Sequence, residues 1–303
     1  MKIFFKKNKY AIIVFSLLLV WISFAIGIYI KEYGYETIFN AREKIIEKCA
    51  DIDFVKNPEM VEMCREWVNL DIELDDTFTA YYTVMFSRAM YYFSLIAPIL
   101  IIVCSVKNFH NDIKYGNIKN KLIREKYSRV MYKSIVNCYK NIFVVILVLI
   151  LALIMCYFVS GHFDYSNALA LGQTTFSEWF FINLPYSYIM YLLVIIFNYI
   201  LYINIALMFT KYNKNIFVCI IASYLTWLAI DIVAEIIITR YVLFMRFGYW
   251  SDDAMNLLAI YTWTPDSWNL IQILFALALA IFSFILVLFS YRKKEVIVIA
   301  SEK

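Results

Sequence analysis

The sequence predicts an all-α protein that crosses a membrane with six helices. Of its 303 residues, 63% are hydrophobic and only 17% are charged, too few to cover the surface of a soluble domain of this length. Apolar runs of roughly 18 or more residues recur along the chain, and in hydrocarbon a helix satisfies its own backbone hydrogen bonds. The expected spans of this single transmembrane domain, residues 1–303, are 10–30, 86–106, 142–159, 186–209, 216–238 and 270–290.

The placement of lysine and arginine predicts that both termini lie in the cytoplasm. These residues accumulate in the cytoplasmic loops of membrane proteins. Residues 107–141 hold nine of them against only Asp112 and Glu125, whereas residues 160–185 hold none. The segments before the first span and after the last span are basic as well. The net charge of +4 reflects this asymmetry and does not require a nucleic-acid partner.

Residues 31–87, between the first two spans, form an acidic insert that is expected on the extracytoplasmic side. Thirteen aspartates and glutamates outnumber six lysines and arginines there. The sequence Asn57-Pro58-Glu59 is a good helix start, because it places a capping side chain, a proline and an acid in order at the positive end of the helix dipole. An apolar helical face also precedes it. We therefore expect two short helices that form a small cap.

Cys49 and Cys64 are the two cysteines of this insert, and each falls on the apolar face of its expected helix. Disulfides persist in extracytoplasmic compartments, so a bridge that closes the helical hairpin is one interpretation. The alternative is a pair of small buried apolar residues. The other four cysteines lie in or beside spans without the spacing of metal ligands, and we expect them to be packing residues.

Sequence motifs for catalysis are missing from this chain. It has no GxxxxGK[ST] loop for ATP, no HExxH pair and no GxSxG elbow. Its two histidines, His110 and His162, are expected on opposite sides of the membrane, which excludes a shared metal site. The sequence therefore argues against an enzyme and predicts that this chain itself binds no cofactor.

The basic segment of residues 107–141 has the pattern most suggestive of function. Asn117 can cap a short helix in which Ile118, Leu122 and Ile123 share one apolar face. One interpretation is that lysines and arginines hold this helix flat on anionic lipid headgroups. The other is that the apolar face docks into a groove on a cytosolic partner and transmits the partner's motion to the second and third spans.

The order of residues in this segment resembles that of the permease subunits of ABC-2-type transporters. Such subunits typically have six spans with both termini inside. Their loop between spans two and three often reads as an aromatic residue, an acid, a glycine, a leucine, a Ser-Arg pair and a lysine entering span three. The matching residues here are Phe109, Asp112, Gly116, Leu122, Ser128, Arg129 and Lys133. The chain departs from the pattern at Lys119 and Asn120, where small or hydroxyl residues often follow the glycine.

The resemblance implies a permease subunit of an ATP-driven exporter in a bacterial plasma membrane, paired with a second permease subunit that is identical or related. Its substrate would be an amphipathic or cationic compound such as an antimicrobial peptide. A separate cytosolic ABC ATPase would hold the ATP and dock at the coupling residues Phe109, Asp112, Gly116, Ile118, Leu122, Ser128, Arg129 and Lys133. The alternative is a non-transporting immunity or sensor protein in which the acidic cap binds a peptide.

Polar residues inside the expected spans are few. Asp231 and Glu235 are four residues apart and share a face of the fifth span, roughly 22 Å and roughly 28 Å from its cytoplasmic end. They form either an interfacial group in which Arg240 partners Glu235, or an acidic lining for the external half of a substrate path. An ion-coupled carrier is a weaker third possibility, because carriers generally place such acids nearer the midplane. Asn198 and Asn204 are expected to form interhelical hydrogen bonds.

Overall fold

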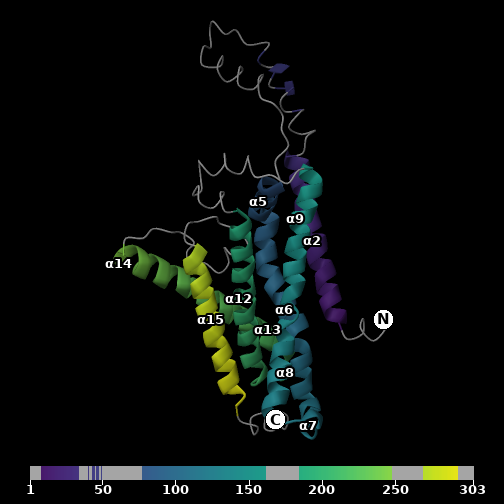
Figure 1. Ribbon diagram of the computed structural model, residues 1–303, viewed down its shortest axis with the longest axis vertical. Helices are drawn as coiled ribbons and strands as arrows, with labels where there is room; N and C mark the ends of the chain where they lie inside the picture. The colour runs from purple at the N-terminus through teal and green to yellow at the C-terminus, as the bar shows by residue number, and fades with distance from the viewer. Residues whose placement is uncertain are drawn as a thin grey trace.

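The computed structural model describes residues 8–33, 77–161, 184–247 and 269–292, together with single positions between 40 and 49. Within these residues the regular secondary structure is helical and contains no strand. Six helices are long and apolar enough to cross a membrane. Figure 1 shows them gathered side by side into one elongated bundle. The prediction of an all-α, multi-pass membrane protein is confirmed.

Four of the spanning helices lie close to the expected positions. They are α2 (Lys9–Tyr33), α9 (Ile142–Ser160), α12 (Leu184–Thr210) and α15 (Asn269–Ser290). Most residues of these helices are apolar, and α9 contains no charged residue between its first and last positions. The apolar runs therefore locate these spans to within a few residues.

The second span and the segment after it differ from the expected loop. Helix α6 (Arg88–Lys114) continues past residue 106, and the short helix α7 (Asn117–Leu122) and helix α8 (Tyr127–Tyr139) follow it. Gly116 makes the turn between α6 and α7 with φ of 68°, a left-handed conformation that glycine adopts without strain. Residues 107–141 are therefore mostly a helical hairpin. The basic side chains reduce the hydropathy of this segment but do not oppose helix formation.

The last part of the acidic insert belongs to the bundle. Helix α5 (Thr77–Phe86) packs against α2, α6 and α9, and its residues Ala80, Tyr81 and Val84 have no exposed surface. Ser87 separates α5 from α6 by adopting an extended conformation, and its hydroxyl accepts a hydrogen bond from the backbone of Met90. The described positions between 40 and 49 are helical, and the formation of a cap by this segment stays a prediction. The second expected cap helix lies outside the described residues.

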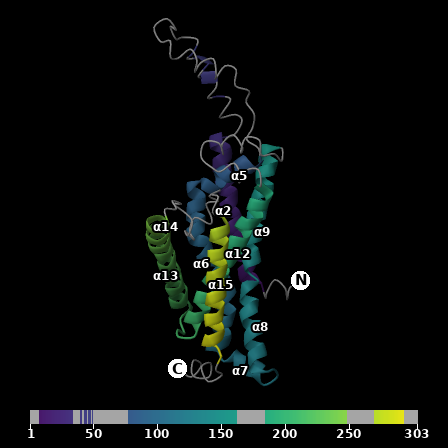
Figure 2. The ribbon, with the colours of Figure 1, turned by 60° about the vertical axis from the view of Figure 1, so that its left-hand side comes forward.

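The fifth span changes its helical type along its length. Helix α13 (Ile216–Val233) runs into the π-helix η1 (Ala234–Phe244), which ends in the short helix α14 (Met245–Phe247). The α14 end of this long helix lies at the edge of the bundle in Figures 1 and 2. A π-helix bonds residue i to i+5 and is rare except as short insertions. The backbone hydrogen bonding of the fifth span therefore changes at Ala234.

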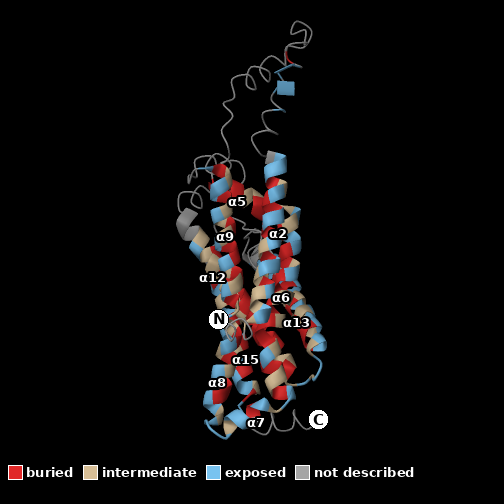
Figure 3. Ribbon diagram, turned by 90° about the vertical axis from the view of Figure 1, so that its right-hand side faces the viewer, coloured by how far each residue is buried: buried red, intermediate tan, exposed pale blue. Residues whose placement is uncertain are grey.

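The core of the bundle surrounds α12. This helix contacts α6, α8, α9, α13 and α15, and every residue from 201 to 207 is buried. Figure 3 shows the buried residues of the helices along the interior of the bundle. Asn204 in α12 donates to the hydroxyl of Ser283 at 2.9 Å, and Asn198 accepts from the indole of Trp227 at 3.0 Å. The expected interhelical hydrogen bonds of both asparagines are confirmed.

Candidate functional site

Basic residues gather at one end of the bundle, called the basic end below. Five segments form it: the last turns of α6, helix α7, the start of α8, the turn between α12 and α13, and the end of α15 (Figure 1). The cationic residues whose side chains the structure describes there include Lys114, Lys121, Arg124, Lys126, Arg129, Lys133, Lys211, Lys214 and Arg292. The hairpin from the expected coupling segment, which joins the second and third spans, thus lies at the same end of the bundle as the ends of the fourth, fifth and sixth spans.

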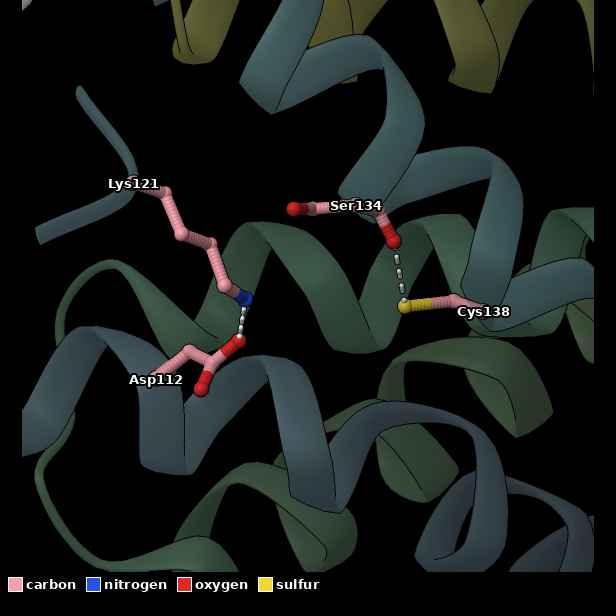
Figure 4. Close-up of polar contacts among 4 residues, drawn as sticks. All are labelled: Asp112, Lys121, Ser134 and Cys138. Carbon is pink, nitrogen blue, oxygen red and sulfur yellow. Dashed lines mark hydrogen bonds and ion pairs between the residues drawn. The ribbon is translucent and has the colours of Figure 1, made fainter. Parts of the chain in front are cut away.

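Helix α7 is held in place mainly by its apolar side chains. Ile118 has no exposed surface and belongs to the main hydrophobic core. Lys121 forms a short ion pair with Asp112 of α6 (Figure 4). The Lys121 side chain is 49% exposed, and exposed pairs contribute only about 0–1 kcal/mol, whereas burial of an isoleucine contributes about 1.5–3 kcal/mol. Ile118 is therefore the main anchor of α7.

The apolar face of α7 points into the chain itself. Ile118 is fully buried and Leu122 is partly buried against the core, while Ile123 is 83% exposed. This placement differs from an apolar face that points outward to a partner. The physical reason is that α6 and α8 continue beyond the apolar spans and supply the surface that covers Ile118. The surface that this segment leaves for a partner combines exposed Ile123 with polar and basic side chains.

Tyr291, directly after α15, connects four helices at this end. Its ring meets the ring of Phe109 in α6 edge to face, with centroids 5.6 Å apart. Its hydroxyl donates to the carbonyl of Leu207 at 2.7 Å and lies 2.8 Å from the hydroxyl oxygen of Thr210, both in α12. Its own carbonyl accepts from the hydroxyl of Tyr127 in α8 at 2.6 Å. The second, third, fourth and sixth spans are therefore joined at one residue.

Sequence reasoning did not identify Tyr291 or Tyr127 as functional candidates. The two residues are 164 positions apart, and no local pattern connects them. The only available signal is that a tyrosine follows the last apolar run directly and precedes Arg292, a position typical of the membrane boundary.

The start of α8 carries the exposed part of the predicted coupling residues. Ser128, Arg129 and Lys133 are all exposed. Lys133 donates to both carboxylate oxygens of Glu125, at 2.9 and 3.2 Å. That hydrogen bond lowers the pKa of the Glu125 carboxyl. The ion pair crosses the turn before α8 and orients the lysine along the helix.

A groove of about 510 Å³ lies between α8 and α15 at the basic end. Ser128, Arg129 and Tyr132 line it from α8, and Leu288 and Arg292 line it from the other side. Tyr132 is 57% exposed, and its aromatic ring lines the groove together with two arginines, Arg129 and Arg292. A partner surface with apolar and acidic side chains would fit this chemistry.

The eight predicted coupling residues thus separate into two groups. Phe109 and Ile118 are buried, and Asp112, Gly116 and Leu122 are partly buried, so these five hold the hairpin together. The other three, on α8, are accessible from outside. The structure brings both groups to the same end of the bundle.

Asp231 and Glu235 have different surroundings. Asp231 lies in α13 and is 2% exposed, while the backbone of Glu235 lies in η1 and its side chain is outside the described residues. The π-helix begins at Ala234, between the two acids, so the spacing at which residues share a helical face changes there. Their role in a substrate path stays a prediction.

The described cysteines comprise one that is bonded and four that are free. Cys49 is bonded in a disulfide. Its expected partner, Cys64, lies outside the described residues, so the pairing of Cys49 with Cys64 stays a prediction. Four further cysteines, each in or beside a span, are buried free thiols: Cys104, Cys138, Cys156 and Cys219. Figure 4 shows the Cys138 thiol donating to the carbonyl of Ser134 within α8, at 3.3 Å.

Metal binding has no support in the part of the chain that the structure describes. No group of three or more histidine, cysteine, aspartate or glutamate side chains there could hold a metal ion.

Compared with known proteins, the chain matches no family model, no curated protein and no solved structure.

Proposed function

We propose that this chain is the membrane-spanning permease subunit of an ATP-driven exporter, and that a separate ATPase docks at the basic end. The observation that carries the proposal is the helical hairpin of α6, α7 and α8. It extends beyond the apolar spans, is anchored at Ile118, and contacts the end of α15 through Phe109 and Tyr127. Such a hairpin is suited to transmit a force applied at its tip.

Transmission follows from how the hairpin continues into the bundle. Helix α6 is 27 residues long and is continuous from its spanning part to its tip. Helices α8 and α9 are separated only by Lys140 and Asn141, and the Asn141 amide donates to the backbone of Cys104 in α6 at 3.0 Å. Because packed helices move as rigid bodies, a displacement of α7 moves the second and third spans together.

The charge of the basic end supports a cytoplasmic location and indicates which side chains a partner would carry. Basic segments favour the cytoplasmic side of a membrane, which is where an ATPase and its ATP are found. Arg129, Lys133 and Arg292 are exposed at the basic end and would meet acidic side chains on the ATPase. The ATPase supplies the hydrolysis of ATP, and this chain supplies the path through the membrane.

The remaining parts of the proposal concern assembly and substrate. A second permease subunit, identical or related, would complete the transporter in a bacterial plasma membrane. The acidic insert of residues 31–87 and the buried carboxyl of Asp231 are suited to an amphipathic or cationic substrate, such as an antimicrobial peptide. Attraction between unlike charges would concentrate such a substrate near the acidic side.

The experiment that tests docking is capture of the ATPase with the intact chain in mild detergent. We expect wild type to retain an ATPase that mass spectrometry identifies by its phosphate-binding loop. Arg129→Glu reverses a charge in the groove and should reduce capture by roughly tenfold or more, which corresponds to about 1.4 kcal/mol. The matched control is Lys140→Glu, an exposed charge reversal at the other end of α8, which should retain capture.

Two results would contradict the proposal. One is a clean preparation of wild type without any ATPase, which would favour the non-transporting immunity or sensor protein. The other is equal loss of capture in both variants, which would show a general charge effect rather than docking in the groove.

A further inference from the structure

A second feature of the basic end is a small cleft between α6 and the turn that joins α12 to α13. It encloses about 70 Å³, and three lysines line it: Lys114 from α6, and Lys211 and Lys214 from the turn. Among the described residues, its lining contains no aspartate or glutamate. Such a concentration of positive charge around a small volume favours an anionic ligand.

His110, which lines this cleft, has a buried ring nitrogen without a hydrogen-bond partner among the described residues. His110 is 2% exposed, and its Nε2 lies 3.0 Å from the carbonyl oxygen of Asn213. A carbonyl accepts hydrogen bonds, so Nε2 carries the proton. The other ring nitrogen, Nδ1, is buried and has no hydrogen-bond partner among the described residues. Because buried polar groups are nearly always satisfied, a water or a ligand group would complete this one.

The lysines of the cleft are available to a ligand. Among the described residues, no carboxylate lies within ion-pair distance of Lys114, Lys211 or Lys214. Lys211 donates one hydrogen bond to the carbonyl of Ser290 at 3.3 Å, which directs its side chain and leaves further N–H groups unused. This cationic set is therefore partly preorganised.

The position of the cleft identifies the kind of anion. Lys211 and Lys214 lie in the short turn between two spans, which places them where lipid headgroups meet water. The next turns of the chain expose apolar side chains to the surroundings: Phe217 is 71% exposed and Ile221 is 60% exposed. A basic cleft beside an exposed apolar helical surface matches a molecule with an anionic head and an acyl tail.

We propose that this cleft binds the phosphate group of an anionic phospholipid, with the acyl chains lying along the first turns of α13. The lysines donate to the phosphate oxygens. With the proton on Nε2, His110 Nδ1 is an acceptor and takes a hydrogen bond from a headgroup hydroxyl. The site goes beyond the proposed function, because lipid binding here does not require an ATPase or a substrate.

The test is native mass spectrometry of the full chain in mild detergent, titrated with phosphatidylglycerol or with phosphatidylcholine. We expect tighter binding of the first lipid. Lys214→Gln should weaken it by about fivefold, because a lysine near an anionic lipid surface contributes about that factor. The matched control is Lys126→Gln, an exposed lysine at the same end that does not line the cleft, and it should bind like wild type.

A second variant separates the ligand role of the histidine from its structural role. In His110→Gln, the side-chain amide can still donate to the carbonyl of Asn213, but Nδ1 is missing. We expect the melting temperature in lipid-free detergent to stay close to that of wild type and phosphatidylglycerol binding to weaken. Equal binding by wild type, Lys214→Gln and His110→Gln would overturn the site.

Inorganic phosphate distinguishes the sources of the phosphate group. If it displaces phosphatidylglycerol at millimolar concentration, the phosphate is the part of the lipid that the cleft recognises. If inorganic phosphate binds while the two lipids bind equally, the lipid assignment is overturned. Neither outcome depends on ATPase capture, so this proposal and the docking proposal fail separately.

Discussion

Two basic connections lie side by side at the same end of the bundle, yet their surroundings differ. The connection through α7 joins the second and third spans by a helical hairpin, and Ile118 holds it in the core. The connection between α12 and α13 is a short turn, and its lysines line a small cleft with His110. Positive charge alone therefore does not define a function. Apolar anchoring suits the first connection to the proposed docking of a protein, while the three lysines suit the second to the proposed anionic ligand.

The largest expected effect is on stability, and it distinguishes the buried isoleucine of α7 from the exposed isoleucine that follows this helix. Ile118→Ala should reduce the free energy of unfolding by about 2–5 kcal/mol, because it leaves a cavity in a packed site. Ile123→Ala, the same kind of truncation at a side chain that is 83% exposed, should change it by less than about 0.5 kcal/mol. Thermal unfolding in one detergent measures both. Equal effects would show that α7 is not anchored as described.

Proline substitutions at two glycines test whether the turn between α6 and α7 has a specific role in ATPase capture. Gly116 and Gly161 both have positive φ, and each donates a backbone hydrogen bond, to Ile113 and Tyr157 respectively. Proline fixes φ near −65° and lacks the N–H, so it disturbs both turns in the same way. We expect Gly116→Pro to lose ATPase capture by roughly tenfold or more, and Gly161→Pro to retain it. Similar losses would indicate global unfolding instead.

Loss of the Tyr291 hydroxyl, where four helices meet, is expected to have an intermediate effect on stability. Tyr291→Phe removes the hydroxyl that donates to Leu207, and should reduce the free energy of unfolding by about 0.5–1.5 kcal/mol. Thr210 keeps its own hydrogen bond to the Leu207 carbonyl at 2.7 Å. Tyr212→Phe, at a ring that is 72% exposed in the neighbouring turn, serves as the control and should be nearly neutral. A neutral Tyr291→Phe would contradict the importance of this junction.

The smallest expected effect is a pH dependence at the start of α8. The Lys133 hydrogen bond lowers the pKa of Glu125 in the folded protein, whereas the pKa of a glutamate in an unfolded chain is about 4.3. The resulting stabilisation is present above the unfolded pKa and is lost as the pH falls through the folded one. Glu125→Gln should therefore be slightly less stable than wild type at pH 7, with the difference vanishing in acid. A difference independent of pH would contradict this account.

The sequence predicts the spans well because hydropathy in a bilayer dominates all other terms. It predicts the end of α6 less well, since basic residues after position 106 resemble a loop although Phe109, His110 and Ile113 recur with helical spacing and are buried. Ile118 is buried because α6 and α8 cover it, and a local sequence pattern does not reveal that these two helices extend far enough to do so. His110 had no distinguishing sequence signal, because its role depends on a turn more than a hundred residues away.

Site-specific photo-cross-linking tests the central claim most directly. A photoreactive amino acid at position 128, in the groove between α8 and α15, would be compared with one at position 140, at the far end of α8. Docking of an ATPase at the basic end predicts a cross-linked ATPase from position 128 and none from position 140. Adducts from both positions, or a lack of ATPase adducts from position 128, would contradict it.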